Sequence, residues 1–358
     1  MTTTVLYSFN KRSYEAKVWE SEIASAGDAR VRFVPFNHDR YLDPGRYVRA
    51  QLLDNLYYAN DPGLGRMYRD LLAAMVAERA DVLVVDTCPP YHPEFLLGLP
   101  AYKVLRIADG PLSAYDRDFA YLHAYDHVLY HSPAYSRDLG MKEKLRYCGA
   151  KRADLWPLAA FDGFRHPGVG EDELFSGERD VDVVFVGALH PNKMPLIARV
   201  KKAFGRRMRL HGLGGWKKNL YFNAVHGFPG WVRPIPSDSF AALYRRTKIG
   251  INLHNRGKYT VGNYRMFDLP ANGAMQISDG GEYLGAFFEP GEEIVGFDGA
   301  DDLVDKVRFY LEHGAERERI ARNGHRRVLR DHTFRERMRQ AGEMILRGMA
   351  GAGTGAAT

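Results

Sequence analysis

The sequence predicts an α/β protein of two Rossmann-like domains, each built on a parallel sheet, and three observations lead to this prediction. The chain of 358 residues has the length of two domains of roughly 150 to 180 residues. Short apolar runs, typical of strands buried on both faces, alternate with helical periodicity in both halves. A stretch rich in Gly, Pro and acidic residues, 161–179, has no periodicity and is interpreted as the linker.

Five apolar runs in residues 1–160 predict the strands of the first domain, and helical spacing at 13–25 and 65–79 separates the first three of them. In such doubly wound sheets ligands lie beyond the carboxyl ends of the strands. We therefore expect functional side chains just after each run. The predicted strands cover residues 4–8, 31–36, 82–86, 104–108 and 127–130.

Periodicity restarts in residues 180–333, which we interpret as the second domain. Predicted helices cover 195–204, a segment beginning near Gly262, 301–314 and 315–330. A last helix over 334–349 is expected to pack back on the first domain, and the Gly/Ala tail 350–358 is expected to be disordered. The predicted strands cover residues 181–189, 207–212, 248–254, 274–278 and 294–297.

Composition points to an ordinary globular protein, because 45% of residues are hydrophobic and 12% aromatic. No basic segment followed by an apolar core opens the chain, and no apolar run approaches the length of a membrane span. We therefore expect a cytoplasmic protein without a transmembrane segment. The two cysteines, Cys88 and Cys148, cannot form a disulfide framework and lack metal-ligand spacing, so we expect buried thiols.

Two strand-to-helix junctions of the second half carry phosphate-binding features. VGALHPNK ends a strand at Gly187 and offers Lys193 where a helix starts, and a helix N-terminus with a nearby cation suits a phosphate. HGLGGW includes Gly214 and Gly215, which allow a ligand to approach the backbone closely. A tight turn without a ligand would use these glycines equally well.

The third junction places polar residues where a ligand site would open. Asn252 and His254 end an apolar strand, and a helix then begins with Asn263 and Arg265 in its first turn. An arginine there opposes the helix dipole, which is explained if an anion lies between them. Asp268 shares a helix face with Arg265, so an intrahelical salt bridge worth about 0.2 to 0.5 kcal/mol is the alternative.

With these motifs in place, residues 183–333 resemble the donor-binding domain of GT-B glycosyltransferases of the "glycosyl transferases group 1" class, and most closely its CgeB-like, spore-maturation type branch. The first 160 residues resemble the family only in general layout, as an acceptor-side domain would. The resemblance implies two Rossmann-like domains facing a central cleft. It is carried by VFVGALHPNK, LHGLGGW, LYRRTKIGINLH, NYRMFDLPANGAMQISD, FFEPGEEIVGF and ERERIARNGHRRVLRDHTF.

The resemblance also implies roles for individual residues. Lys193 matches the diphosphate-binding lysine and Arg265 the arginine that clamps the phosphates, while Asp268 matches the acidic residue that binds the donor ribose. Two positions depart from the family pattern, since Thr260 stands at its first acidic position and Ala188 where an arginine is frequent. The remaining implied donor-binding residues are Gly187 and Asn263 at the diphosphate, and Gly214, Gly215, Val232, Asn252 and His254 at the ribose or base.

Catalysis would need stabilisation of the departing nucleotide diphosphate and a base for the acceptor. Lys193, Arg265 and a helix N-terminus supply the first without a metal, and no cofactor is expected. Strand-end placement makes Asp109 the first and His131 the second candidate for the base, although strand-end Asp residues also cap helices. The DxD-like segments 116–118 and 180–182 are expected to be solvated carboxylates.

The net charge of +6 is concentrated near the C-terminus, where residues 316–339 hold nine arginines and four acidic residues. Such a segment can attract nucleic acid, lipid headgroups or an acidic polymer, and a solvated helix face explains it equally well. An anionic surface is thus one candidate partner of this segment.

The favoured function is a glycosyltransferase of the hexosyl type (EC 2.4) that uses a nucleotide-diphosphate sugar. Its acceptor is a polysaccharide, natural product, protein or nucleic acid, and the class resemblance favours retention of configuration. A nucleotide-sugar epimerase or hydrolase is an enzymatic alternative. A non-catalytic nucleotide-binding or nucleic-acid-associated accessory protein is the other alternative. The departures at Thr260 and Ala188 keep it open. The joint presence of Lys193, Arg265 and Asp268 argues against it.

Overall fold

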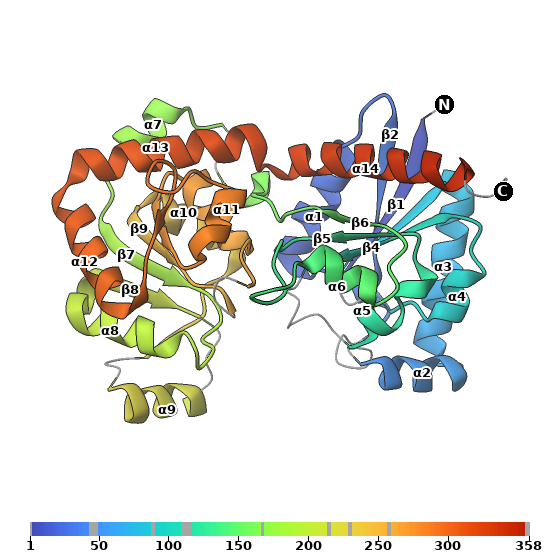
Figure 1. Ribbon diagram of the computed structural model, residues 1–358, viewed down its shortest axis with the longest axis horizontal. Helices are drawn as coiled ribbons and strands as arrows, with labels where there is room; N and C mark the ends of the chain where they lie inside the picture. The colour runs from blue at the N-terminus through green and yellow to red at the C-terminus, as the bar shows by residue number, and fades with distance from the viewer. Residues whose placement is uncertain are drawn as a thin grey trace. The chain divides into compact units, whose positions relative to one another are not determined.

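The chain forms two compact units, each with its own parallel sheet (Figure 1). Unit 1 consists of Met1–Pro157 and Phe334–Thr358, and unit 2 of Leu158–Thr333. This computed structural model describes residues 2–42, 49–86, 90–108, 116–165, 168–212, 216–227, 231–255 and 259–354.

Unit 1 has a six-stranded sheet in the order β2-β1-β3-β4-β5-β6, and all neighbouring strands run parallel. Parallel strands covered by helices on both faces are buried throughout, which explains their continuous apolar runs. The strands are β1 (Thr3–Phe9), β2 (Val31–Asn37), β3 (Val82–Asp86), β4 (Tyr102–Ile107), β5 (His127–Tyr130) and β6 (Ala153–Leu155).

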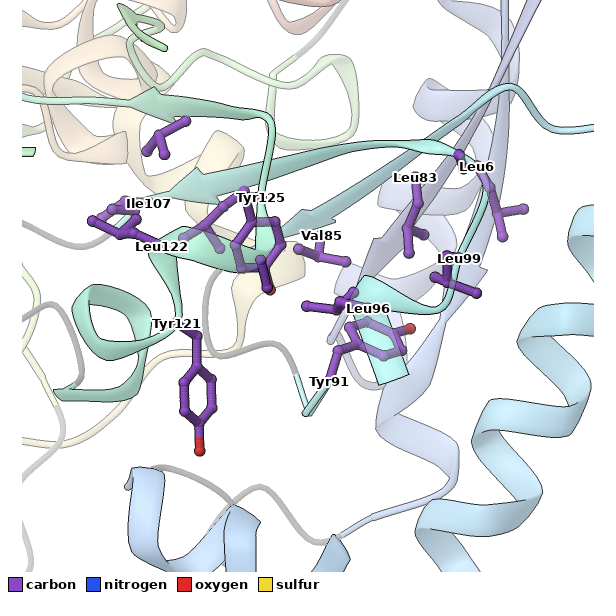
Figure 2. Close-up of a cluster of buried hydrophobic side chains, with 14 of the residues drawn as sticks. Leu6, Leu83, Val85, Tyr91, Leu96, Leu99, Ile107, Tyr121, Leu122 and Tyr125 are labelled. Carbon is purple, nitrogen blue, oxygen red and sulfur yellow. The ribbon is translucent and has the colours of Figure 1, made fainter. Parts of the chain in front are cut away.

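Helices cover the faces of this sheet and close its core. Figure 2 shows Leu83 and Val85 of β3 beside Leu96 and Tyr91, all in one buried hydrophobic cluster. The helices are α1 (Ser13–Ser25), α2 (Ala50–Tyr58), α3 (Pro62–Glu78), α4 (Pro93–Leu97), α5 (Asp116–Ala120), α6 (Met141–Tyr147) and α14 (Phe334–Thr354), with 3-10 turns at His38–Arg40 and Leu122–Ala124.

The C-terminal helix α14 belongs to unit 1, where it packs against α1. The Trp19 and Phe334 ring centroids are 5.7 Å apart, and Trp156 Nε1 donates to the carbonyl of Arg337 at 2.5 Å. The helix continues to Thr354, five residues past its predicted end, and the rest of the tail lies outside the described residues.

Unit 2 has a five-stranded parallel sheet in the order β12-β11-β9-β7-β8. Its strands are β7 (Val181–Val186), β8 (Met208–His211), β9 (Thr247–Asn252), β11 (Met275–Ser278) and β12 (Val295–Gly296). Its helices are α7 (Glu171–Ser176), α8 (Met194–Phe204), α9 (Trp216–His226), α10 (Phe240–Arg245), α11 (Tyr264–Ala271), α12 (Gly299–Glu312) and α13 (Gly314–Asp331), with 3-10 turns at Asp162–Phe164, Gly205–Arg207, Ser237–Ser239 and Gly281–Ala286.

The predicted α/β fold with two parallel sheets is confirmed, but two local expectations differ from the structure. The segment 161–179 contains a 3-10 turn and α7 and is part of unit 2, because Glu171 at the start of α7 pairs with Arg326 of α13 at 2.8 Å. Cys148, expected to be buried, is half-buried at the end of α6, while Cys88 lies outside the described residues.

Candidate functional site

The carboxyl ends of β7 and β8 approach each other closely in unit 2 because both are followed by glycine. The Gly187 N–H donates to the His211 carbonyl at 2.9 Å, and a Cβ on Gly212 would lie 2.4 Å from the Gly187 oxygen. Gly187 itself has φ +153°, a conformation that L side chains rarely adopt. The glycine-lined strand edge predicted at Gly187 therefore exists, whereas Gly214 and Gly215 lie outside the described residues.

Arg265 lies next to this edge, in the first turn of α11. Asn263 caps the helix, its side-chain oxygen accepting from the Met266 N–H at 3.0 Å. The Arg265 guanidinium carbon lies 4.7 Å from the centroid of the Phe185 ring. A Cβ on Gly187 would lie only 2.6 Å from Arg265 Nη2, so the glycine provides the space that the guanidinium occupies.

The Arg265 guanidinium is buried with one nitrogen unsatisfied by the described residues. Its Nη1 is buried without a hydrogen-bond partner, and within the described part of the chain the side chain forms no ion pair, with Asp268 or any other carboxylate. Burial lowers the pKa of Arg265, against opposition from Tyr244, Asp279 and Asp268. Buried donors are nearly always satisfied in folded proteins. An anion at this position would satisfy the guanidinium and relieve its conflict with the α11 dipole.

Lys193 is a second buried cation of the same site. It stands directly before α8 with 3% of its surface exposed, and its Nζ donates to Asn255 Oδ1 at 2.8 Å. Burial and then the positive charge of Arg265 lower the pKa of Lys193 to about 7, while Asp279 partly opposes them. Since the charge of Arg265 acts on Lys193, the two predicted diphosphate ligands share one electrostatic environment.

His254 holds the loop between β9 and α11. Its Nδ1 lies 2.7 Å from Asp279 Oδ1, and its Nε2 accepts from the Gly262 N–H at 3.2 Å. With Nε2 accepting, Nδ1 is the ring nitrogen that donates to Asp279. Asn252, at the end of β9, donates to Ser278 Oγ at 3.2 Å. His254, predicted to bind ribose or base, thus positions the loop that precedes α11, while Asn252 links β9 to β11.

Two other predicted donor residues are buried and carry structural hydrogen bonds. Asp268 is 8% exposed in α11, where its carbonyl accepts from Asn272 Nδ2 at 2.9 Å. Val232 uses its backbone N–H and carbonyl in bonds of 2.8 and 3.2 Å to the Asn219 side chain. The negative charge of Asp268 acts on Arg265 and raises its pKa, against the effect of burial.

The candidates for the base belong to unit 1. His131 follows β5 and is 4% exposed, and its Nδ1 lies 3.3 Å from the Ile107 carbonyl. Asp109 lies outside the described residues. Another strand-end acid, Asp86, forms a 2.5 Å ion pair with Arg106, which makes it a structural residue.

The DxD-like segments are not simply solvated as expected. Asp180 and Asp182 flank the start of β7, at the opposite end of that strand from Gly187, and both form ion pairs. Asp182 pairs at 2.6 Å with Arg207 and with Lys248, and Asp180 pairs with Arg246. Asp118 is buried, with 2% of its surface exposed. The two cations that pair with Asp182 are distant in sequence, since Lys248 lies on the neighbouring strand β9 and Arg207 in the 3-10 turn before β8.

The arginine-rich segment 316–339 is largely matched by carboxylates. Its ion pairs include Arg319 with Glu292 and Glu316, Arg322 with Glu171 and Glu318, Arg326 with Glu171, Arg327 and Arg330 with Asp331, and Arg339 with Glu336 and Glu343. Within the described ranges, no helix has the length and hydropathy required to cross a bilayer.

Sequence reasoning missed three contributors to the site. Asn255 accepts from Lys193, Asp279 anchors His254, and Phe185 lies under Arg265. Asp279 follows a predicted strand directly, so the strand-end rule that selected Asn252 also applies to it. For Asn255 and Phe185 only the spatial arrangement reveals the contact.

Comparisons with known proteins show a family likeness over part of the chain and a shared fold over nearly all of it. Residues 193–343 match the family model described as "Glycosyl transferase-like". No curated protein sequence matches the chain. The family model does not identify the CgeB-like branch, which stays a prediction.

Three solved structures share the fold over nearly the whole chain. Sucrose-phosphate synthase from Thermosynechococcus elongatus is 12% identical, with a TM-score of 0.63 over 98% of this chain and 100% of that chain. HepE of Anabaena, in complex with UDP-glucose, is 10% identical, with a TM-score of 0.60 over 97% and 99%. A putative UDP-N-acetylglucosamine 2-epimerase from Listeria monocytogenes is 10% identical, with a TM-score of 0.52 over 90% and 91%. The predicted GT-B architecture is thereby confirmed at the level of fold.

Proposed function

We propose that the protein is a glycosyltransferase that takes a nucleotide-diphosphate sugar as donor and binds its diphosphate between Lys193 and Arg265. One observation carries the proposal: the buried Arg265 Nη1 has no hydrogen-bond partner in the described chain, beside a second buried cation at the carboxyl edge of a parallel sheet. Anionic ligands bind at such edges and at helix N-termini. The matched family model covers Lys193, Arg265 and both helices that they begin.

The chemistry that follows needs only these side chains. As the bond between the sugar and the diphosphate breaks, negative charge grows on the leaving oxygen, and two preplaced cations stabilise that charge in a site of low polarity. The approaching anion raises the pKa of Lys193, so the lysine is fully protonated in the complex. This arrangement supports transfer without a metal or other cofactor.

The finer features of the proposal rest on the family resemblance. We propose a hexosyl donor, retention of configuration and a cytoplasmic enzyme, and the UDP-glucose complex of HepE supports a nucleotide-sugar donor. In unit 1, Asp109 and then His131 are the candidates for activating the acceptor hydroxyl. The acceptor is a polysaccharide, a natural product, a protein or a nucleic acid.

A donor panel tests the proposal. Nucleotide sugars and nucleoside diphosphates should raise the melting temperature selectively, and Arg265→Ala should abolish the shift while leaving the fold intact. Arg308→Ala is the matched control, because Arg308 is an exposed arginine of α12 that pairs with Asp305 on the same helix. Release of the nucleoside diphosphate is then followed with water and with candidate acceptors. If neither nucleotide sugars nor nucleoside diphosphates stabilise the wild type, the donor site is wrongly assigned.

A nucleotide-sugar epimerase is the second candidate, favoured by the fold shared with the Listeria protein. The two enzymes differ in what happens without an acceptor. An epimerase converts the donor sugar to its epimer with the nucleotide still attached, and NMR of the recovered nucleotide sugar detects this. A transferase returns the donor unchanged or hydrolysed.

A nucleic-acid-associated role is disfavoured because the arginines of segment 316–339 are largely paired with carboxylates, as at Arg326 and Glu171. It is tested by DNA and RNA binding at increasing salt. Binding that weakens steeply with salt and is lost when these arginines are neutralised would favour that role over sugar transfer.

A further inference from the structure

One stretch of unit 2 contains many basic residues and no acidic ones. Between Asp182 and Asp238 the chain has ten lysines and arginines and no aspartate or glutamate. Three of the ten find carboxylates elsewhere, as Arg199 does with Asp301 at 2.7 Å. Exposed cations without an ion pair in the described chain are Lys202, Arg206, Lys217, Lys218 and Arg233.

Helix α9, in the middle of this stretch, exposes its apolar side chains. Asn219 and Phe222 are its buried residues, 1% and 3% exposed, and Phe222 joins the hydrophobic core of unit 2. Trp216 is 61% exposed and Val225 56%. Leu220 and Tyr221, one turn along, are also exposed. The helix therefore attaches by a narrow stripe and presents most of its large apolar surface outward.

A second tryptophan joins this surface. Asn219 of α9 binds both backbone groups of Val232, at 2.8 and 3.2 Å, which fixes the segment after α9 against the helix. Trp231, next in the chain to Val232, is 51% exposed. Helix α8 also contacts α9, which lies beside it at the lower side of unit 2 in Figure 1. The last turn of α8 and the 3-10 turn after it contribute Lys202 and Arg206.

We propose that this surface, the α9 face, docks on an anionic lipid surface. It consists of the apolar residues Trp216, Leu220, Tyr221, Val225 and Trp231 and the cations Lys202, Arg206, Lys217, Lys218 and Arg233. On α9 the exposed apolar residues and the lysines are interspersed along the outward side, so apolar groups can enter the headgroup and acyl boundary of a bilayer while the neighbouring cations meet anionic headgroups. Tryptophan and tyrosine prefer the headgroup level, and each nearby cation adds attraction to anionic lipids.

The chemistry of the α9 face favours lipid over nucleic acid. Aromatic rings and cations would serve both partners, but Leu220 and Val225 are aliphatic and cannot stack on bases. Buried in acyl chains, they remove apolar surface from water. The inference does not rest on the donor site, because none of its residues belongs to that site.

Vesicle binding tests the proposal with an internal reporter. Trp19 and Trp156 are buried, at 2% and 1% exposure, so a change in tryptophan fluorescence reports Trp216 and Trp231. The full-length protein should co-sediment with vesicles of phosphatidylcholine and phosphatidylglycerol in equal parts, with a blue shift of emission, and much less with phosphatidylcholine alone. Raising the salt concentration should weaken the binding. An absence of binding to the anionic vesicles at low salt would overturn the proposal.

Paired variants separate the α9 face from the rest of the surface. Lys217→Ala with Lys218→Ala should lower the partition coefficient about tenfold or more. Lys17→Ala with Arg66→Ala removes two exposed cations of α1 and α3 and should leave it nearly unchanged. Equal losses in the two pairs would mean that total charge drives binding and would overturn the proposal.

The apolar residues need a test of their own. Leu220→Ser with Val225→Ser should reduce binding, whereas Val76→Ser with Phe309→Ser, at exposed apolar positions of α3 and α12, should not. Two outcomes would reassign the surface. Single-stranded RNA that binds more tightly than the vesicles would make it a nucleic-acid site, and a dimer dissociated by the first pair would make it a self-association face.

Discussion

Lys193 donates from its Nζ to the amide oxygen Oδ1 of Asn255 at 2.8 Å, so the buried amine has an uncharged partner. Within the described part of the chain no carboxylate forms an ion pair with it, and burial together with Arg265 lowers its pKa to about 7. A buried cation without an opposite charge costs stability. The site therefore carries a cost in the free protein that an anionic ligand would remove.

Replacing Lys193 with methionine should stabilise the free protein. Methionine keeps most of the apolar stem and removes the poorly compensated amine, so we expect a gain of about 1 to 3 kcal/mol at pH 7. The melting temperature should rise, and the stabilisation by nucleoside diphosphates should disappear. A lower melting temperature in the variant would contradict the buried-cation account.

Ligand binding should depend on pH through Lys193. The folded chain holds its pKa near 7, below the ordinary value of 10.5, so unfolding takes up a proton between these values and this group's contribution to stability rises with pH there. A diphosphate favours the protonated amine. Its binding should therefore take up a proton above pH 7, and its affinity should fall as pH rises toward 9.

Calorimetry in two buffers of different ionisation enthalpy measures this proton uptake. Lys193→Arg is the matched control, because a guanidinium stays charged throughout this pH range. Its affinity should vary much less with pH. The same pH dependence in both proteins would assign the titration to another group.

Gly187→Ala should weaken donor binding more than its effect on stability explains. The new Cβ would meet Arg265 Nη2 at 2.6 Å, in a backbone with φ +153°, so the guanidinium must move. We expect a loss of about 1 to 3 kcal/mol of stability from the backbone alone and a clear loss of nucleotide affinity.

Gly205→Ala is the control, since Gly205 also has positive φ, +52°, but no atom within 4 Å of the added carbon. It should lose stability and keep nucleotide affinity; equal affinity in both variants would remove Gly187 from the site.

Asp86→Asn should strongly destabilise unit 1. Asp86 and Arg106 form a 2.5 Å ion pair with side chains 7% and 3% exposed, and the guanidinium carbon of Arg106 lies 4.5 Å from the centroid of the Trp156 ring. Taking the charge from one partner of a buried pair costs about 3 to 5 kcal/mol. Denaturant unfolding followed by tryptophan fluorescence measures it.

The control for this prediction is an exposed pair in the same unit. Glu78→Gln removes the charge that pairs with Arg32 at 2.7 Å, where both side chains are more than a third exposed. We expect a change below about 1 kcal/mol. A similar small change for Asp86→Asn would show that the buried pair is not needed for stability.

Local pattern predicted the strands well because parallel strands buried on both faces must be continuously apolar. The run 127–130 coincides with β5, and 82–86 with β3. The segment 161–179 was interpreted as a linker because it lacks apolar periodicity. Its short helix is held to α13 by ion pairs, such as that of Glu171 with Arg326, and ion pairs leave no periodic pattern in the sequence.

Part of the candidate site could also be predicted. A cation in the first turn of a helix contradicts the dipole, and this local conflict singled out Arg265 before any contact was known. The contact of Asn255 with Lys193 could not be predicted. The strand-end rule points to Asp279, but its pairing with His254 depends on the register that sets Asn252 of β9 beside Ser278 of β11.

The sequence by itself determined two alternating β and α units and the strand ends where polar side chains gather, because burial periodicity and helix termini are local properties of the chain. Only the tertiary structure decided which of those side chains are satisfied within the protein. Asp86 meets Arg106 and Asp182 meets Lys248, whereas Arg265 has no such partner in the described residues. Electrostatic pairing depends on which groups are neighbours in space, and residues far apart in the chain become neighbours only when the sheets form.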